Sequence, residues 1–460
     1  MQKSDVSMTQ ISGREGFGST LGVIAATLGS AVGLGNIWKF PYITGENGGA
    51  AFILIYLGCV CFIGLPVMIS EFIIGRRANT ACVGAFKKLA PATPWFFTGL
   101  SGVICAFFIM FYYTSVAGWV FAYIFKALTG KIVTSDPKIA EQVFSSLVTS
   151  VWSPLIWQWI VLFVTGAIIL AGVKNGIERM AKTLLPILFL LLVICVIRAL
   201  TLPGAAAGVS FLFSPDFSKI TGATILAAMG LAFFKLSVGI GVMTTYGSYI
   251  GREENLIGTG VKVVIADTMV SVLAGLAIFP AVFAFGFNPD MGPSLLFITI
   301  PMVFNAMPFG QVFLTIFFIL AAIAAMGAMI SLFNSPVAYL TEDRGWSRTK
   351  ATIFTGLVMA AVGSTATLSN SLLADVQLFN LNLFNFYSYL TDNLMMPLTG
   401  LFFAIFAGWK LSRWEIFDEV SNGGSLNNRS RISFYFAAIR FVAPIAIIII
   451  ILNGLGFIKL

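Results

Sequence analysis

Two glycine-rich phrases interrupt long apolar runs of the chain, and the second begins with a lysine. They read GSAVGLGNIWKFP from Gly29 to Pro41 and KLSVGIGVMTTYG from Lys235 to Gly247. Glycine weakens a helix and lets a backbone or a ligand approach closely. A helix broken in apolar surroundings exposes N–H groups on one half and carbonyls on the other, which suits a carboxylate and a cation. Close helix packing through small residues is the alternative.

Few other side chains in the apolar runs can do chemistry. Glu71 stands alone in one run, and a carboxylate in such a place is functional or part of a polar network by default. Histidine is absent, which removes the usual general base and metal ligand. The five cysteines have neither metal nor disulfide spacing and are interpreted as small buried hydrophobes. Without a catalytic constellation the chain is not expected to be an enzyme, and no cofactor or metal beyond a possible sodium is expected.

The elements that must position these groups are membrane-spanning helices. Hydrophobic residues make up 58% of the 460 residues, charged residues only 10%, and the mean hydropathy is +0.94. A soluble fold would lack polar surface, so we predict an all-α polytopic membrane protein in contact with the lipid bilayer. About eleven apolar runs are long enough to cross about 30 Å of hydrocarbon. They are 19–43, 50–75, 95–128, 155–173, 181–202, 221–250, 259–287, 310–341, 350–368, 378–411 and 432–457.

The distribution of basic residues predicts the topology. With a cytoplasmic N-terminus, the inner segments carry far more Lys and Arg than the outer ones. Because eleven crossings separate the termini, we expect a multi-pass protein of the plasma (inner) membrane with the C-terminus outside. The opening segment lacks the pattern of a cleavable signal and is interpreted as a polar tail. The net charge of +8 needs no nucleic acid, since it suits a cytoplasmic face against anionic lipid.

The two glycine-rich phrases fall in the first and sixth predicted spans. Five spans separate them, and an odd number inverts the second half of a chain relative to the first, so the breaks would meet at mid-membrane. This predicts a transporter with a five-plus-five inverted repeat and broken first and sixth helices. The predicted units are a tail over 1–18, repeats over 19–202 and 221–411, and an extra helix over 432–457.

Five stretches resemble the neurotransmitter:sodium symporter family, in its bacterial amino-acid transporter branch, in order and at family spacing. They are GSAVGLGNIWKFPY, ENGGAAFILIYLGCVCFIGLPVMISEFIIGR, FYYTSVAGW, FFKLSVGIGVMTTYGSY and GPSLLFITIPMVFNAMPFG. The resemblance implies the inverted-repeat fold and transport of an amino acid by alternating access. It gives no oligomeric state.

The resemblance also implies a substrate site. Tyr113 would donate its hydroxyl to the substrate carboxylate, Phe234 would form a lid, and Glu71 would brace the broken sixth helix. The implied substrate-binding residues are Ser30, Ala31, Gly33, Gly35, Ile109, Tyr113, Phe234, Ser237 and Ile240.

Gate residues follow from the same resemblance, with departures on the outer side. The implied gate residues are Arg14, Phe17, Tyr249 and Asp343 on the cytoplasmic path and Lys39 and Phe234 on the outer path. Lys39 replaces an arginine, Ser388 aligns with its acidic partner, and Asn385 replaces another acid. Asp392 lies one helical turn further along and is a candidate partner for Lys39.

The implied ion sites depart most from the family pattern. The implied ion, or surrogate-ion, residues are Gly29, Ala31, Val32, Asn36, Lys235 and Asp267. Lys235 replaces a threonine or serine of the first sodium site, and Ala266 aligns with its asparagine. The hydroxyls of the second sodium site align with Ala328 and Met329, or with Gly327 and Ala328. Chloride is not expected, because Tyr56 remains but Leu231 and Val270 replace polar residues.

These departures predict that the Lys235 ammonium replaces the first sodium, with Asp267 as its partner in the empty site. Transport of a neutral or apolar amino acid would then be sodium-independent or proton-coupled. Three alternatives stay open: a purely structural Lys235–Asp267 pair, an ordinary sodium symporter that uses a residual backbone site, and a channel.

Overall fold

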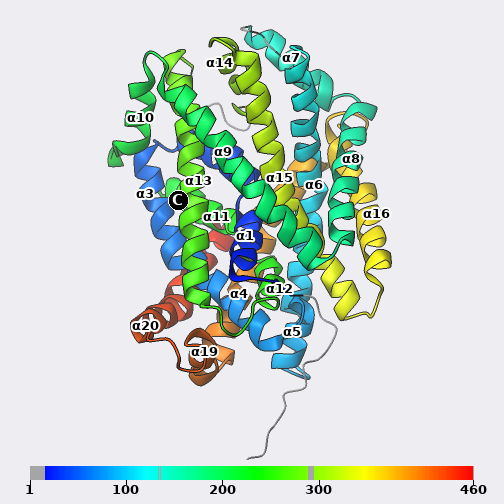
Figure 1. The fold of residues 1–460 in the computed structure, drawn as a ribbon, viewed down its shortest axis with the longest axis vertical. Coiled ribbons are helices and arrows are strands. Elements are labelled where there is room, and N and C mark those ends of the chain that lie inside the picture. Colours follow the sequence, from blue (N-terminus) through cyan, green and yellow to red (C-terminus); the bar gives the residue numbers. More distant parts are fainter. Residues whose placement is uncertain (1–15, 133, 135, 288–294, 459–460) are drawn as a thin grey trace, which may run out of the picture.

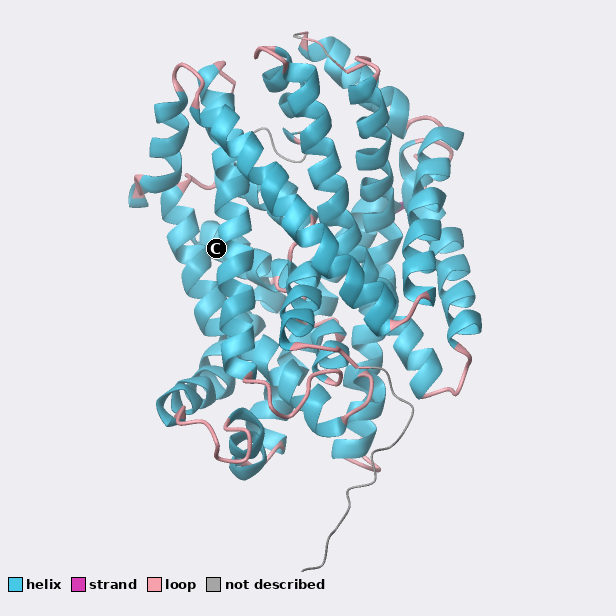
Figure 2. Cartoon of the chain, in the orientation of Figure 1, coloured by secondary structure: helices cyan, strands magenta, loops and turns pink. Residues whose placement is uncertain are grey.

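The computed structural model describes residues 16–132, 134, 136–287 and 295–458, and within them the chain is almost entirely helical (Figures 1 and 2). Nine helices in this part are long and apolar enough to cross a membrane. They are Ala50–Ala78, Phe96–Leu128, Trp152–Leu170, Val173–Leu200, Leu256–Ala284, Gly310–Glu342, Arg348–Asn370, Leu383–Lys410 and Arg429–Gly454. The bent helix pair Thr20–Ala31 and Gly35–Glu46 makes a tenth span in the described part of the chain, and Gly222–Lys235 is a shorter apolar helix at the place of the predicted sixth span.

The first broken span bends by 51° between Thr20–Ala31 and Gly35–Glu46. Its first half, α1 (Thr20–Ala31), begins at Ser19, whose side chain accepts a hydrogen bond from the Gly22 N–H. The second half is a wide π-helical turn, η1 (Gly35–Lys39), followed by α2 (Phe40–Glu46). The break therefore falls on the residues between Ala31 and Gly35, inside the first glycine-rich phrase.

The second broken span is α11 (Gly222–Lys235) followed by α12 (Val242–Gly247), with non-helical backbone between them. Gly239 and Gly241 have φ angles of 77° and 68°, which favour glycine. A Cβ at Gly239 would also lie 2.3 Å from the Met396 carbonyl oxygen. Gly239 is needed because the unwound segment passes directly against the tenth span, and a Cβ at Gly241 would lie 2.6 Å from the Cys82 sulfur.

The other spans surround these two breaks. The third, α6 (Phe96–Leu128), and the eighth, α15 (Gly310–Glu342), pack along each other through the middle of the molecule (Figure 1). The remaining spanning segments are α3 (Ala50–Cys59), η2 (Val60–Gly64), α4 (Leu65–Ala78), α8 (Trp152–Leu170), η3 (Val173–Glu178), α9 (Arg179–Leu200), α13 (Leu256–Ala284), α16 (Arg348–Thr367), η6 (Leu368–Asn370), α17 (Leu383–Leu390), η7 (Thr391–Met395), α18 (Met396–Ile405), η8 (Phe406–Lys410), α20 (Arg429–Ala437), η9 (Ala438–Val442) and α21 (Ala443–Gly454).

Short elements close the two ends of the bundle. In the orientation of Figure 1, α7 and α10 lie at the upper part, and α5 and α19 lie at the lower end. These short elements are α5 (Cys82–Leu89), α7 (Pro137–Val148), α10 (Ala205–Phe213), η4 (Phe217–Lys219), α14 (Thr299–Asn305), the antiparallel strands β1 (Gln377–Leu378) and β2 (Leu381–Asn382), and α19 (Arg413–Val420).

Three predicted span boundaries differ from the structure, the first two of them by more than a turn. The fifth span begins at Val173 rather than 181, because a π-helical turn carries the helix through the charged stretch VKNGIE. The tenth begins at Leu383 rather than 378, since the strands β1 and β2 take up the preceding residues. The sixth ends as a helix at Gly247 rather than 250. The boundaries of the two predicted repeats stay predictions.

Candidate transport site

A small cavity lies where the two helix breaks meet. Its volume is about 30 Å³, enough for one or two water molecules, so the site is closed in this conformation. All nine sequence-predicted substrate residues line it, from Ser30 on the first span to Ile240 on the sixth. Its lining residues are Ser30, Ala31, Gly33, Gly35, Ile109, Tyr113, Phe234, Lys235, Ser237, Ile240, Ala328, Leu332 and Met396.

Two apolar lining residues were missed from the sequence. Leu332 comes from the eighth span and Met396 from the tenth, and each lies in a run so apolar that nothing marks one face. Met396 reaches the cavity because the unwound backbone at Gly239 packs directly against its carbonyl. The side-chain end of the cavity is therefore lined by flexible apolar groups.

Hydrogen-bond donors gather on one side of the cavity. The Leu34 N–H donates to the Tyr113 hydroxyl at 3.0 Å, which leaves the proton of that hydroxyl free to donate elsewhere. A Cβ at Gly33 would lie 3.0 Å from the same hydroxyl, so only glycine leaves room there. Opposite them, the Ser237 hydroxyl donates to the Ser30 carbonyl at 2.9 Å and ties the two breaks together. The Tyr113 hydroxyl is therefore the donor that these contacts leave available for a carboxylate.

Lys235 lies beside this cavity with its ammonium fully buried. Its Nζ is 2.9 Å from Asp267 Oδ2 and 3.0 Å from the Tyr56 hydroxyl, and it also donates to the Ser271 hydroxyl. The ammonium lies 4.9 Å from the Phe40 ring centroid, within cation–π range. The predicted Lys235–Asp267 pair is therefore present in the structure.

Asn36 holds the other side of the same carboxylate. Its amide donates to Asp267 Oδ1 at 2.7 Å, to the Asp267 carbonyl at 3.0 Å and to the Ser271 hydroxyl at 2.9 Å. The alignment of Ala266 with the seventh-span asparagine was wrong by one residue, because Asp267 and not Ala266 faces Asn36. Ser271, one turn further along α13, was missed for the same reason.

Glu71 braces the broken sixth span, in the way that the resemblance implied. Its carboxylate accepts from the Gly239 N–H at 2.7 Å, and from both the N–H and the hydroxyl of Thr244 at 3.2 Å. These N–H groups have no helical partner, because Gly239 lies in the unwound segment and Thr244 in the first turn of α12. Glu71 is fully buried, so no water competes for them.

The place implied for a second sodium holds backbone carbonyls that face the eighth span. A Cβ at Gly327 would lie 2.5 Å from the Gly29 carbonyl oxygen and 3.3 Å from that of Val32. The eighth-span residues facing the break are thus Gly327 and Ala328, in agreement with the second of the two alignments. One turn further along this helix, the Ser331 hydroxyl donates back to the carbonyls of Gly327 and Ala328.

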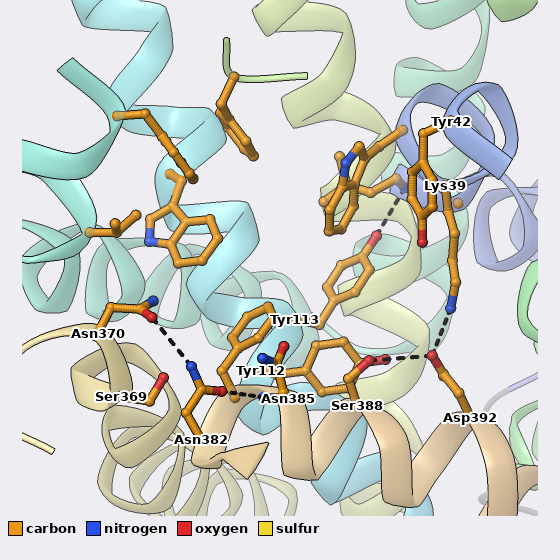
Figure 3. Close-up of a pocket in the computed structure, with 18 of the residues that line it drawn as sticks. Lys39, Tyr42, Tyr112, Tyr113, Ser369, Asn370, Asn382, Asn385, Ser388 and Asp392 are labelled. Atoms are coloured by element: carbon orange, nitrogen blue, oxygen red, sulfur yellow. Dashed lines mark hydrogen bonds and ion pairs between the residues drawn. The ribbon is translucent and has the colours of Figure 1, made fainter. Parts of the chain in front are cut away.

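An ion pair and an aromatic ring separate the cavity from a vestibule of about 710 Å³. Lys39 Nζ lies 2.7 Å from Asp392 Oδ2 and 3.8 Å from the centroid of the Phe234 ring (Figure 3). The Ser388 hydroxyl donates to the same Asp392 oxygen. The acid that pairs with Lys39 therefore lies one turn further along the tenth span than the position that the family pattern implied, Ser388. Phe234 lines both cavities and closes the passage between them.

The path that the resemblance assigned to the cytoplasmic gate residues is closed by aromatic contacts. The Phe17 ring packs edge-on against Tyr246 and Tyr249, and the backbone N–H of Phe17 donates to the Tyr249 carbonyl. Asp343 accepts from the Gly84 N–H at 3.1 Å and from Lys87 at 3.2 Å, which places it against α5. The predicted gate residue Arg14 lies outside the described residues. The molecule is thus closed below the site and hollowed above it.

Fold and site together define a polytopic carrier whose substrate site lies between two broken helices. A model of the Sodium:neurotransmitter symporter family matches residues 14–138 and 141–459, and the chain belongs to this family. An uncharacterized sodium-dependent transporter of Bacillus subtilis, YhdH, is 39% identical, with 96% of this chain and 98% of that protein covered. One from Haemophilus influenzae is 36% identical, with the same two shares.

A solved structure shares the fold. The crystal structure of MhsT in complex with L-phenylalanine superposes with a TM-score of 0.89 at 41% identity, covering 96% of this chain and all of that one. The predicted fold class, an all-α transporter with broken first and sixth helices, is confirmed. So is the prediction that the protein is a transporter and not an enzyme.

Proposed function

We propose that this protein carries a neutral, apolar amino acid across the membrane by alternating access, and that the Lys235 ammonium takes the place of the first sodium ion. The observation that supports the second part is that Lys235 lines the substrate cavity while its Nζ lies 2.9 Å from Asp267. A fixed cation there compensates the substrate carboxylate without a bound ion. It also repels a sodium ion from the same place.

The lining of the cavity supports the substrate class. Ile109, Ile240 and Leu332 line the cavity, and desolvating a charged side chain among them would be costly. The related MhsT structure holds L-phenylalanine, a substrate-sized apolar amino acid. Lysine and glutamate are therefore expected to compete poorly. Decarboxylated amines are expected to bind poorly too, because they lack the anion that Tyr113 and Lys235 would meet.

A second candidate is an ordinary sodium symporter that uses a residual backbone site. The carbonyls of Gly29 and Val32 face Gly327 and are the oxygens left for such an ion. The relatives from Bacillus subtilis and Haemophilus influenzae are named sodium-dependent transporters. The eighth-span residues that face these carbonyls, Gly327 and Ala328, carry no side-chain oxygen that could complete the ligands of a sodium ion.

Uptake into liposomes separates the two candidates. Purified protein is reconstituted and given labelled phenylalanine or leucine, with outside sodium exchanged for N-methylglucamine at fixed ionic strength. The proposal predicts equal saturable uptake in both media, and uptake that rises with an inward proton gradient if Lys235 exchanges a proton during the cycle. Uptake that requires sodium contradicts the surrogate cation, and ion currents without saturable uptake contradict a carrier.

Met396 is expected to set the size limit of the side-chain end. Shortening it to alanine leaves space beside the unwound segment, so the ratio of apparent affinities for tryptophan over valine is expected to rise about tenfold, the effect of one or two methylenes in an apolar pocket. Competition against labelled leucine measures the ratio. Met359→Ala, a buried methionine on α16 away from the cavity, is the matched control and should leave the ratio unchanged. An unchanged ratio in Met396→Ala would remove Met396 from the pocket.

A further inference from the structure

Two arginines flank one aromatic ring at the lower end of the tenth and eleventh spans. Arg440 Cζ lies 5.4 Å from the Phe436 ring centroid and 5.7 Å from that of Trp409, and Arg413 Cζ lies 5.9 Å from Phe436. We call Trp409, Arg413, Phe436 and Arg440 the arginine–aromatic cluster. It joins the end of η8, the start of α19 and the first third of the eleventh span.

The positive charge of this cluster is not neutralised within the described part of the protein. Arg440 donates one hydrogen bond, from Nε to the Gly408 carbonyl at 2.6 Å, which leaves the far edge of its guanidinium without a described partner. Arg413 has no described hydrogen bond, and no described carboxylate lies within 4 Å of either arginine. Within the described part of the protein, the two like charges are therefore available to an anion from outside the chain.

The acidic residues closest in sequence are already engaged elsewhere. Glu419 pairs with the buried Arg76 at 2.8 Å, and Glu415 pairs with Arg77 at 3.2 Å. Glu415 also caps α19 by accepting from the Ser412 N–H. The same helix thus uses its acids to hold the interior of the bundle and presents Arg413 outward.

The cluster is continuous with a surface of exposed apolar side chains. Trp409 and Phe441 are 60% and 56% exposed, and their ring centroids lie 6.1 Å apart. Ile445 and Ile448 continue this exposed surface further along the eleventh span. Aromatic side chains at the end of an apolar helix surface are typical of the boundary between lipid headgroups and acyl chains.

We propose that the arginine–aromatic cluster binds the phosphate of an anionic membrane phospholipid, whose acyl chains lie along Phe441 and Ile445. A guanidinium held by aromatic faces keeps a rigid fork of N–H groups for phosphate oxygens. The paired positive charge disfavours a zwitterionic headgroup such as choline, because its ammonium would add a third cation. The exposed apolar surface selects a lipid over free phosphate.

Titration of lipid into the full-length protein in detergent tests this site. Phosphatidylglycerol in mixed micelles is expected to raise the unfolding midpoint of the wild type. In R413Q/R440Q the apparent affinity should fall about 30-fold, the combined effect of two cations near a charged surface. R429Q/R431Q removes two exposed arginines of the same end outside the cluster and should behave as the wild type.

Three comparisons decide the outcome. If R413Q/R440Q and R429Q/R431Q lost affinity for phosphatidylglycerol equally, the attraction would be unspecific and the proposal would be overturned. It would also be overturned if phosphatidylcholine raised the unfolding midpoint of the wild type as much as phosphatidylglycerol does. The same stabilisation by inorganic phosphate would replace the lipid by a free anion. Should R413Q/R440Q fail to fold, R413Q alone removes an exposed side chain without a described hydrogen bond and is expected to weaken phosphatidylglycerol binding about fivefold. Wild-type affinity in that variant would contradict the site.

Discussion

Lys235→Thr is expected to lower amino-acid affinity at least about 100-fold in sodium-free medium, measured by binding of labelled leucine to purified protein. The substrate carboxylate loses its cation, and Asp267 is left buried with only Asn36, Tyr56 and Ser271 around it. Removing one partner of a buried ion pair costs about 3–5 kcal/mol of folding free energy. A 100-fold loss of affinity corresponds to about 2.7 kcal/mol of binding free energy. The unfolding midpoint should fall as well.

The double variant K235T/D267N separates binding from folding. Both charges are removed, so the unfolding midpoint should recover while sodium-free affinity stays low. With threonine and asparagine restored beside Asn36, sodium should now raise the affinity. Lys262→Thr, an exposed lysine on the same helix as Asp267, is the control for the loss of a positive charge and should change neither property. Unchanged sodium-free binding in Lys235→Thr would assign Lys235 to a structural pair.

Glu71→Ala is expected to reduce transport to less than about a tenth of the wild-type rate. The N–H groups of Gly239 and Thr244 would lose their acceptor in a fully buried place, and each unsatisfied donor costs about 1–3 kcal/mol. The unwound segment that lines the cavity would then lose its position. Initial uptake rates in liposomes, with the amount of inserted protein determined for each variant, measure the effect.

Two further variants test whether position is the cause. Glu71→Gln keeps one carbonyl oxygen for Gly239 but turns an NH₂ group toward the Thr244 N–H, so its transport should lie between those of Glu71→Ala and the wild type. Ser70→Ala removes a neighbouring buried hydroxyl that bonds to Tyr435, on the side away from the break, and should retain transport. Wild-type rates in Glu71→Ala would show that the sixth span holds its break without the carboxylate.

The sequence predicted the features that stand out against an apolar background. Glycine-rich interruptions, a lone glutamate and a lone lysine are rare in such runs, so the two breaks and the importance of Glu71 and Lys235 were predictable from the residues. The family resemblance implied the bracing role of Glu71 and the place of Lys235 near Asp267. The sequence did not predict which residues of a uniformly apolar helix face the site, because this depends on the rotation of the helix about its own axis. A uniformly apolar helix has no polar face, so the alignment of α13 slipped by one residue and Ser271 was missed.

Contacts between distant spans were hidden for a related reason. Met396 enters the cavity only because Gly239 lets the unwound backbone approach the tenth span. Asp392 partners Lys39 although the family pattern put the acid at Ser388, because a helical turn along α17 and η7 keeps both residues on the same face. The Met396 contact is not local in the chain, and a single sequence carries no record of it, whereas Asp392 could be named as a candidate partner for Lys39 from its place one turn beyond Ser388.

The Lys235–Asp267 pair has an electrical consequence. Whether the shared proton rests on the amine or on the carboxyl group, the charges of the pair add to zero, and the two atoms lie 2.9 Å apart. Moving one elementary charge through a potential of 100 mV costs about 2.3 kcal/mol. A carrier with an unpaired buried lysine would have to supply this energy each time its empty site returned across the membrane. With its counterion carried on a neighbouring span, the empty site moves no net charge, and its return step should be insensitive to membrane voltage.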